Sequence, residues 1–341
     1  MVKKQGKRRT IPTSAGLAVT GASSFLGSHL ADSLREDRHF AKRIVTMDIR
    51  RPGVFRESAD FHQIDLTKPT ADSEVAEVLR AQRVDTVAHL AFFSRPVKDE
   101  SYAHELEVIG TMHVLTACAA AGIRKIIIAS ATAVYGASPK NPNFLTEDHP
   151  LEGNKNYRYI RDRIEVENLA KRFRESHPGT IVTVLRFATI LGPTVRNLAT
   201  DYFRRPFVPT LLGYDPLVQL LHEDDGVRAL VAAIRKDCSG AYNIVGKGVL
   251  PLRTVVSVMG KISIPMVYGI AHPMISALRF FNAADAPSQH LDYLRYLWVA
   301  DGTKAEGELG FEPRYTTREA ALAFAGAKRL RRIHLSTASE M

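Results

Sequence analysis

The feature that most constrains the fold is an apolar stretch, residues 16–20, that runs into a glycine-containing turn from Gly21 to Gly27. Apolar residues with helical spacing follow this turn directly. A strand ending in such a turn directs the free backbone N–H groups of the next helix toward an anion, which suits the pyrophosphate of a dinucleotide. Asp48 ends the next predicted strand, where a carboxylate can accept hydrogen bonds from the adenosine ribose. An ordinary tight turn with a solvated Asp48 is the competing interpretation, and the order of strand, turn, helix, strand and acid favours the dinucleotide site.

Strand-like and helix-like segments alternate through the first half of the chain, which is typical of a parallel sheet covered by helices on both faces. Short runs such as residues 125–129 are nearly all apolar, as strands buried on both sides should be. The pattern predicts an α/β protein with a Rossmann-type, doubly wound parallel sheet and a smaller C-terminal α/β lobe. The predicted strands lie near residues 16–20, 43–48, 61–65, 85–90, 125–130 and 182–189, and the predicted helices near 27–36, 73–81, 101–121 and 157–175.

Prolines become frequent after residue 190, where the regular alternation is lost. We therefore expect a nucleotide-binding domain over residues 14–190. A lobe that binds substrate is expected over residues 191–325, with some of its strands and helices returning to the main sheet. Basic tails, residues 1–13 and 326–341, would flank these two parts.

The net charge of +10 comes from 46 basic and 36 acidic residues, and nine of the basic residues lie in the two tails. The rest of the chain is nearly neutral, so specific nucleic-acid binding by the folded part is not expected. Tails of this composition are expected to be disordered. Nonspecific attraction of the tails to anionic membrane or nucleic acid is the alternative.

The two cysteines, Cys118 and Cys238, lack the spacing of metal ligands, so neither a disulfide framework nor a zinc site is predicted. An apolar run of about 18 residues, long enough to span a bilayer, is absent. We therefore expect a cytoplasmic protein without a transmembrane segment. Residues 262–281 are rich in apolar side chains but contain two prolines and His272, so they are predicted to be buried or to line a pocket rather than to insert into a membrane.

Further short motifs follow in order along the chain, among them Asp65-Leu66 after the third predicted strand and Leu90-Ala91 after the fourth. With the turn and Asp48, they make the chain resemble the extended branch of the short-chain dehydrogenase/reductase superfamily, the NAD-dependent sugar epimerases and dehydratases. The resemblance covers roughly residues 15–325. Its other motifs are Val108-Ile109-Gly110-Thr111, Ser130 to Gly136, Arg186, Gly192-Pro193, His222 to Asp225, Tyr242 to Gly246 and Lys304 to Pro313.

The resemblance implies a tyrosine that gives or takes a proton while a nicotinamide carbon exchanges hydride with the substrate. A cation four residues later lies on the same helical face, lowers the phenol pKa and binds the nicotinamide ribose. Two registers are present, Tyr157 with Arg161 and Tyr159 with Arg163. The second is preferred, because the residues after Arg163 match the family's continuation. In either register arginine stands where the family has lysine.

Ala131 stands where the family usually has the serine or threonine that hydrogen-bonds the reacting oxygen, and Thr132 or Ser130 is expected to take this role. NAD is favoured over NADP because Asp48 repels a 2′-phosphate, although Arg50 and its neighbour Arg51 would attract one. The resemblance implies cofactor contacts for Gly21, Ser24, Phe25, Leu26, Gly27, Asp48, Asp65, Leu66, Leu90, Ala91, Tyr159 and Arg163.

Three residues depart from the family where it recognises nucleotide sugars: Glu107 in the helix, and Thr189 and Leu191 before Gly192. The expected substrate is therefore a nucleotide sugar or an apolar alcohol or ketone. His89 is expected to be structural. His222, Asp224 and Asp225 are expected to cap the following helix rather than bind a metal.

The leading hypothesis is an NAD-dependent oxidoreductase or epimerase-like enzyme, with Tyr159 as general acid/base and Arg163 as the ribose-binding cation. The resemblance further implies a homodimer built on the helices at residues 101–121 and 157–175. The alternative is a catalytically impaired NAD-binding protein that acts as a redox-responsive or scaffold partner. A third hypothesis is a nucleic-acid binder that acts through its basic ends.

Overall fold

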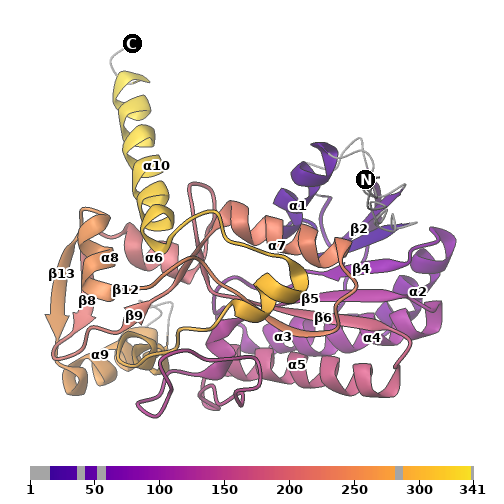
Figure 1. Ribbon diagram of the computed structural model, residues 1–341, viewed down its shortest axis with the longest axis horizontal. Helices are drawn as coiled ribbons and strands as arrows, with labels where there is room; N and C mark the ends of the chain where they lie inside the picture. Colours follow the sequence, from indigo (N-terminus) through magenta and orange to yellow (C-terminus); the bar gives the residue numbers. More distant parts are fainter. Residues whose placement is uncertain (1–15, 37–42, 52–58, 281–286, 339–341) are drawn as a thin grey trace, which may run out of the picture.

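The computed structural model describes residues 16–36, 43–51, 59–280 and 287–338. Its main body is a seven-stranded sheet in the order β11-β6-β5-β4-β1-β2-β3, and all neighbouring strands in it are parallel. This is the doubly wound arrangement predicted from the sequence (Figure 1). The strands are β1 (Leu17–Thr20), β2 (Ile44–Asp48), β3 (Asp60–Gln63), β4 (Thr86–His89), β5 (Lys125–Ala131), β6 (Ile181–Phe187) and β11 (Gly240–Ile244).

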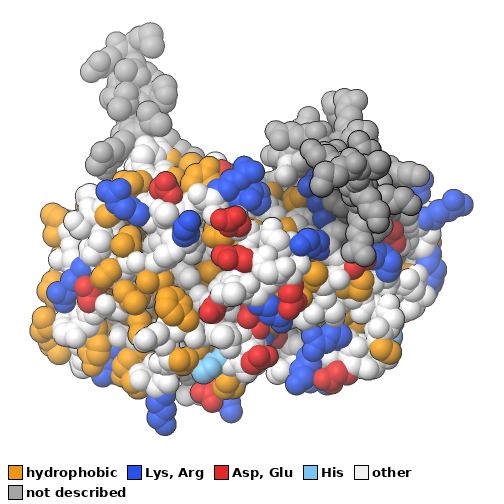
Figure 2. Space-filling model, in the orientation of Figure 1, with side chains coloured by type: hydrophobic (Ala, Val, Ile, Leu, Met, Phe, Trp, Pro, Cys, Tyr) orange, Lys and Arg blue, Asp and Glu red, His pale blue; other side chains and the backbone are white. Residues whose placement is uncertain are grey.

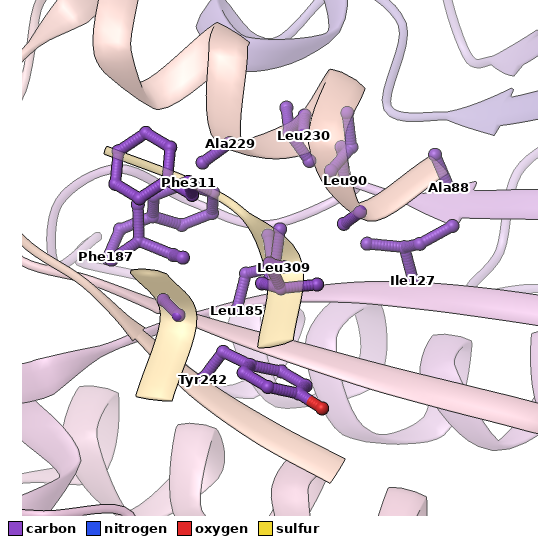
Figure 3. Close-up of a cluster of buried hydrophobic side chains, with 14 of the residues drawn as sticks. Ala88, Leu90, Ile127, Leu185, Phe187, Ala229, Leu230, Tyr242, Leu309 and Phe311 are labelled. Carbon is purple, nitrogen blue, oxygen red and sulfur yellow. The ribbon is translucent and has the colours of Figure 1, made fainter. Parts of the chain in front are cut away.

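Apolar layers cover both faces of this sheet, because successive strand residues point to opposite sides. Val19 and Ile127 belong to the layer beneath α1 and α7, part of which is drawn in Figure 3. Ala18 and Ile126 belong to the opposite layer, against α2, α4 and α5. These helices are α1 (Phe25–Glu36), α2 (Ala71–Ala81), α4 (Gly110–Ala121), α5 (Arg158–Ser176) and α7 (Glu223–Arg235).

The smaller lobe is built mainly from residues after β6 and has its own apolar core, which includes Val208, Leu252 and Phe324. β11 returns from this part of the chain to the main sheet, as expected. The lobe contains three two-stranded sheets, β10-β7, β12-β9 and β13-β8. Its elements are β7 (Thr189–Leu191), α6 (Leu198–Arg204), β8 (Phe207–Leu211), β9 (Leu217–Val218), β10 (Leu220–His222), β12 (Leu250–Pro251), α8 (Leu252–Val258), β13 (Ile262–Met266), α9 (Tyr268–Phe280) and α10 (Thr317–Ala338).

The helix predicted over residues 101–121 is interrupted by a π turn. α3 (Glu100–His104) leads into a π-helical segment (Glu105–Ile109), and α4 follows. The Thr111 hydroxyl donates to the carbonyl of Glu107 inside this turn. Gly110 lies so close to Leu66 that an added Cβ would be 3.1 Å from the Leu66 Cβ. Such insertions are frequent at functional sites, and this one holds Glu107 in the site described below.

Two expectations about the C-terminal half are wrong. Residues 262–281 were predicted to be buried or to line a pocket, yet Ile262 and Ile270 of β13 and α9 are among the most exposed large apolar side chains. Residues 326–338 were predicted to be disordered, yet they form the end of α10, which projects from the lobe (Figure 1). The basic tail at residues 1–13 lies outside the described residues. Among the described helices, none combines the length and apolarity needed to cross a membrane.

Candidate functional site

The turn after β1 has room only for glycine at two positions. Gly21 has a φ of +65°, and a Cβ there would lie 2.5 Å from the backbone of Ala91. A Cβ on Gly27 would lie 2.5 Å from the Gly21 carbonyl oxygen. The two glycines therefore let the turn pack closely against α1 and the end of β4. This is the arrangement that holds a pyrophosphate in dinucleotide-binding folds.

Ser24 stands between these glycines and supports the start of α1. Its Oγ accepts a hydrogen bond of 3.1 Å from the backbone N–H of Gly27, in the manner of a helix N-cap. Phe25 and Leu26 are the first two residues of α1, and Leu26 packs on the apolar layer below the helix.

Asp48 lies at the end of β2, beside the glycine turn. Its carboxylate accepts hydrogen bonds from the backbone N–H of Ser23 at 2.9 Å and of Arg50 at 3.2 Å. The carboxylate is thus held where β1 and β2 both end. Asp65, by contrast, accepts from the backbone and hydroxyl of Thr67 at 3.0 and 2.7 Å, which closes a local turn.

The strand order reverses between β1 and β4, and a buried polar chain crosses this point. Thr20 Oγ1 lies 2.6 Å from His89 Nδ1, and His89 Nε2 lies 2.9 Å from Thr111 Oγ1. Burial, and secondarily the charge of Arg163, lowers the pKa of His89 to about 3. His89 is therefore a neutral, packed residue, as expected from the sequence. Leu90 and Ala91 follow it and are buried beside Gly21.

Tyr159 and Arg163 meet at the carbonyl oxygen of Phe93, just beyond β4. The Tyr159 hydroxyl donates to this oxygen at 3.3 Å, and Arg163 Nη2 donates to it at 2.5 Å. The guanidinium carbon also lies 5.4 Å from the centre of the Tyr159 ring and 4.6 Å from that of Phe92. The two residues that the sequence pairs through one helical turn of α5 are thus in contact.

Glu107 is the buried counter-charge of Arg163, because its Oε2 lies 3.3 Å from Arg163 Nε and its Oε1 accepts from Nη2 at 3.3 Å. Glu107 Oε1 also accepts from the backbone N–H of Phe93 at 2.8 Å. Only 1% of Glu107 and 5% of Arg163 are exposed. Burial raises the pKa of the Glu107 carboxyl, and the charge of Arg163 opposes that shift.

This pair changes the expected acidity of the phenol. Burial raises the pKa of Tyr159 above its ordinary value; the charge of Arg163 lowers it and that of Glu107 raises it. The sequence predicted a lowered phenol pKa from the arginine alone. The charge of Arg163 lowers the pKa of Tyr159 as predicted, but burial raises this pKa by more.

The other tyrosine and arginine pair that the sequence offers, Tyr157 with Arg161, has different surroundings. Tyr157 is the residue before α5 and is buried, and its hydroxyl has no hydrogen-bond partner among the described residues. Arg161 is half exposed, and its Nε lies 3.8 Å from Asp162 Oδ1. Tyr157 lies beside Tyr159, with ring centres 5.9 Å apart, and both line one small pocket with Glu107.

The two candidate hydroxyls after β5 lie in different surroundings. Ser130 Oγ donates to Glu167 Oε1 at 2.5 Å, within a buried ion pair between Glu167 and Arg186. The Ser130 hydroxyl proton is therefore already used in the hydrogen bond to Glu167. Ala131 is the last residue of β5, and Thr132 begins a 3-10 turn (Thr132–Tyr135), so the chain has left extended geometry at Thr132. Successive side chains of a strand point to opposite faces, so Thr132 can take the place of a side chain at position 131 only where the backbone is no longer extended.

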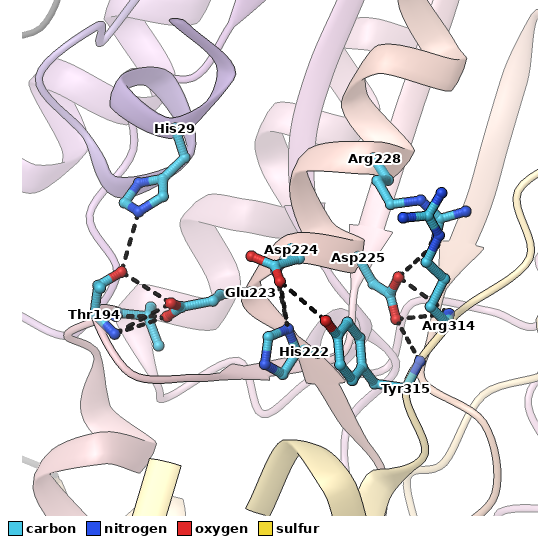
Figure 4. A network of polar contacts seen from close by, with 10 residues as sticks. His29, Thr194, His222, Glu223, Asp224, Asp225, Arg228, Arg314 and Tyr315 are labelled. Atoms are coloured by element: carbon cyan, nitrogen blue, oxygen red, sulfur yellow. Dashed lines mark hydrogen bonds and ion pairs between the residues drawn. The ribbon is translucent and has the colours of Figure 1, made fainter. Parts of the chain in front are cut away.

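The start of α7 connects the nucleotide side to the lobe (Figure 4). Glu223 accepts hydrogen bonds from the backbone N–H groups of Thr194 and Val195, at 3.0 and 2.9 Å, and from the Thr194 hydroxyl at 3.0 Å. Thr194 Oγ1 in turn lies 3.0 Å from Nε2 of His29 on α1. A Cβ on Gly192 would overlap the Glu223 carboxylate, so only glycine fits before this loop.

His222 caps α7 as predicted, since its Nδ1 accepts from the backbone N–H of Asp224 at 3.2 Å. The prediction that the two aspartates cap this helix is wrong. Asp225 accepts from the backbone N–H groups of Arg314 and Tyr315 at 2.9 and 3.0 Å, and Asp224 accepts from the Tyr315 hydroxyl at 3.3 Å. Both carboxylates hold the segment that enters α10.

Comparisons with known proteins agree with this geometry. The NAD dependent epimerase/dehydratase family matches residues 17–245. An uncharacterised protein of Mycobacterium tuberculosis (strain ATCC 25618 / H37Rv) is 33% identical over 310 residues, which cover 89% of this chain and 81% of the relative. UDP-glucose 4-epimerase 4 of Oryza sativa subsp. japonica is 27% identical over 326 residues, which cover 80% of this chain and 84% of the relative.

Solved structures show the same fold. MoeE5 in complex with UDP-glucuronic acid and NAD has a TM-score of 0.72 at 23% identity, and the match covers 93% of this chain and 99% of that one. DesIV, a dTDP-glucose 4,6-dehydratase from Streptomyces venezuelae with NAD and TYD bound, has a TM-score of 0.73 at 20% identity, with 93% and 98% covered.

The chain belongs to the NAD dependent epimerase/dehydratase family. The resemblance, the fold class and the NAD dependence predicted from the sequence are thereby confirmed at the level of the family. The sequence did not reveal that Glu107 pairs with Arg163. The signal available was that both positions depart from the family's usual residues, one gaining an acid and the other a larger cation.

Proposed function

We propose that the chain is an NAD-dependent oxidoreductase or epimerase that exchanges hydride at a hydroxyl or carbonyl carbon of its substrate. The observation that carries this proposal is the convergence of Tyr159 and Arg163 on the Phe93 carbonyl. Phe93 follows the carboxyl end of β4, on the sheet edge where the glycine turn and Asp48 also lie. Ligands of open α/β sheets bind at this edge, where the strand order reverses.

The residues of the crevice fit NAD, because Gly21 and Gly27 let the turn pack closely against the end of β4 and the start of α1, and the Asp48 carboxylate lies beside this turn. In this proposal the turn and the start of α1 hold the pyrophosphate, Asp48 holds the adenosine ribose, and Arg163 faces the nicotinamide ribose. NAD, when bound, supplies the hydride acceptor, and its reduced form supplies the donor. The remaining residues assigned to the cofactor are Ser24, Phe25, Leu26, Asp65, Leu66, Leu90, Ala91 and Tyr159.

Tyr159 holds the mobile proton at its hydroxyl oxygen. Because its pKa is raised, the phenol is protonated at neutral pH and is ready to donate a proton to a carbonyl oxygen. Donation suits reduction of a ketone, and removal of a proton from an alcohol becomes faster as the pH rises. Thr132 is the better placed hydroxyl to orient the reacting oxygen, since Ser130 donates to Glu167.

Two substrate classes remain in the proposal. Nucleotide sugars are supported by the name of the rice relative and by the sugar nucleotides bound to MoeE5 and DesIV. Apolar alcohols or ketones are supported by Glu107, Thr189 and Leu191, which replace residues that recognise sugar nucleotides in the family. We further propose a homodimer built on α4 and α5, which light scattering would detect.

A catalytically impaired NAD-binding protein is the second candidate, and one observation favours it. The guanidinium of Arg163 is already engaged by Glu107 and by the Phe93 carbonyl. An engaged cation offers fewer donors to a ribose than a lysine ammonium that is free to turn.

The experiment that tests both candidates compares Tyr159→Phe with Tyr157→Phe. Calorimetry first establishes NAD binding, and hydride transfer is then followed over a panel of nucleotide sugars, alcohols and ketones. Tyr159→Phe is expected to lower turnover about a hundredfold or more with NAD binding retained. Tyr157→Phe is the matched control, because within the part of the chain that the structure describes the Tyr157 hydroxyl makes no hydrogen bond that the substitution would remove. Equal activity of the Tyr159→Phe variant and the parent would contradict the catalytic assignment, and NAD binding without turnover of any compound would favour the second candidate.

A further inference from the structure

An outward-facing apolar surface covers one side of the smaller lobe. We call it the lobe face and define it by the exposed side chains of β8, β13 and α9 and of the residue that follows each strand. Figure 2 shows hydrophobic side chains gathered over the region where Figure 1 places these elements. Its members are Phe207, Leu212, Ile262, Ile264, Val267, Ile270, Met274 and Leu278, which are 39–64% exposed.

The β8-β13 pair exposes large apolar side chains on its outer side, although Val208 of β8 is buried in the core of the lobe. Phe207 pairs with Ile262, and both side chains are more than half exposed. Thr210 and Ser263 lie an odd number of residues after Phe207 and Ile262 in their strands. Their hydroxyls are joined by a 2.7 Å hydrogen bond, and Thr210 is buried. A water-facing strand normally places its apolar residues inward and its hydroxyls outward.

Helix α9 also exposes apolar side chains. Ile270, Met274 and Leu278 follow one another at four-residue spacing and form a stripe on the exposed side of the helix. The adjoining side carries Ala271 and Ile275, which pack on the lobe. A helix that is apolar on both sides requires an apolar partner on its outer side.

Basic residues border the lobe face, and two of them are paired with acids: Arg204 Nη1 lies 3.4 Å from Asp201 Oδ1, and Arg279 Nη2 lies 2.7 Å from Glu100 Oε1. Residues 202–214 and 261–280 contain no aspartate or glutamate, whereas they contain Arg204, Arg205, Lys261 and Arg279. Arg205 is exposed just before β8, and Lys261 lies just before β13. Because Phe207 and Ile262 are paired in parallel register, these two cations lie at the same end of the strand pair.

We propose that the lobe face docks on an anionic lipid bilayer, with its aliphatic side chains among the lipid headgroups and Arg205 and Lys261 against lipid phosphates. An apolar surface with a cationic border is the pattern of an interfacial membrane contact. A second copy of the chain is the alternative occupant, which light scattering would reveal. α9 also carries Arg279 to the pocket that contains Tyr159, where its guanidinium meets Glu100 at 2.7 Å. Docking would therefore place the pocket near the membrane surface.

Flotation of the full chain with vesicles tests this proposal. Vesicles of phosphatidylcholine alone are compared with vesicles that also contain phosphatidylglycerol. We expect the parent to float with the anionic vesicles, and the Ile262→Asp, Ile270→Asp double variant to partition at least about tenfold less. Phe144→Asp is the matched control, since Phe144 is 49% exposed but lies in the loop between β5 and α5.

Three outcomes would overturn the proposal. The parent may stay unbound to anionic vesicles, or the double variant may bind them as well as the parent does, which would assign the attraction to the basic tails. The third outcome is a lower molecular mass of the double variant than of the parent in light scattering. This result would mean that the lobe face joins copies of the chain. Circular dichroism of the variants ensures that a loss of binding is not a loss of folding.

Discussion

Replacing Glu107 by glutamine removes one charge of the buried pair and leaves its shape in place. The carboxylate lies 3.3 Å from Arg163 Nε and also accepts from the backbone N–H of Phe93. Leaving one partner of a buried ion pair uncompensated costs about 3–5 kcal/mol. Glutamine keeps an acceptor for Phe93, so we expect a loss at the lower end, about 3 kcal/mol. With about 2.1 cal/mol/K of unfolding entropy per residue, this corresponds to a fall in Tm of roughly 4 °C.

Calorimetric and urea unfolding of the Glu107→Gln variant measure this loss. Glu105→Gln makes the same substitution two residues earlier, at an exposed position of the same π turn, and is expected to change the free energy of unfolding by less than about 0.5 kcal/mol. The loss should shrink as the pH falls, because burial raises the pKa of Glu107 and a protonated carboxyl is as neutral as glutamine.

The same variant tests the acidity of Tyr159. Glu107 raises the pKa of the phenol and Arg163 lowers it, so without the carboxylate the pH profile of alcohol oxidation should shift to lower pH. Unchanged stability together with an unmoved pH profile would refute the reasoning, because the pair would then influence neither the fold nor the phenol.

Three further outcomes are expected. Asp48→Ala should weaken NAD binding at least about tenfold while NADP loses less, measured by calorimetry, since the carboxylate that repels the 2′-phosphate is gone. Gly27→Ala should destabilise the chain by about 1–3 kcal/mol in urea unfolding, because the new Cβ meets the Gly21 carbonyl, whereas Gly179→Ala has open space and should be neutral. Stability should fall as the pH drops from about 6.5 toward the folded-state pKa of His89, about 3, since only the unfolded chain binds the proton in that range. A flat stability profile across this pH range would contradict the neutral, buried assignment of His89.

The parts of the fold that the sequence predicts well depend on local signals. The turn around Gly21 and Gly27 and the alternation of short apolar runs with helical segments place six strands of the seven-stranded main sheet within a few residues of their observed positions, whereas β11 was not predicted at its residues. Such signals suffice because strands covered on both faces are apolar throughout and cannot be mistaken for surface segments. Strand order then follows from the family.

The candidate site is less predictable, because its decisive contacts join distant positions. Residues 107 and 163 are far apart in the chain, and neither residue type alone indicates that the two side chains meet. The π turn that carries Glu107 also has no signal in the helical pattern. The lobe face shows the same limit in another form, since apolar composition at residues 262–281 is equally compatible with a buried segment and an exposed one.

The first turn of α7 has a consequence for how the molecule moves. Glu223 holds the loop next to α1, and Asp225, two residues later, holds the backbone at Arg314 and Tyr315. One rigid helix end is therefore tied both to the wall of the nucleotide crevice and to the segment that leads into α10. Opening of the crevice would disturb the contacts of Glu223, and reorientation of the segment before α10 would disturb those of Asp225. Because both carboxylates belong to the first turn of α7, we expect the two motions to be coupled.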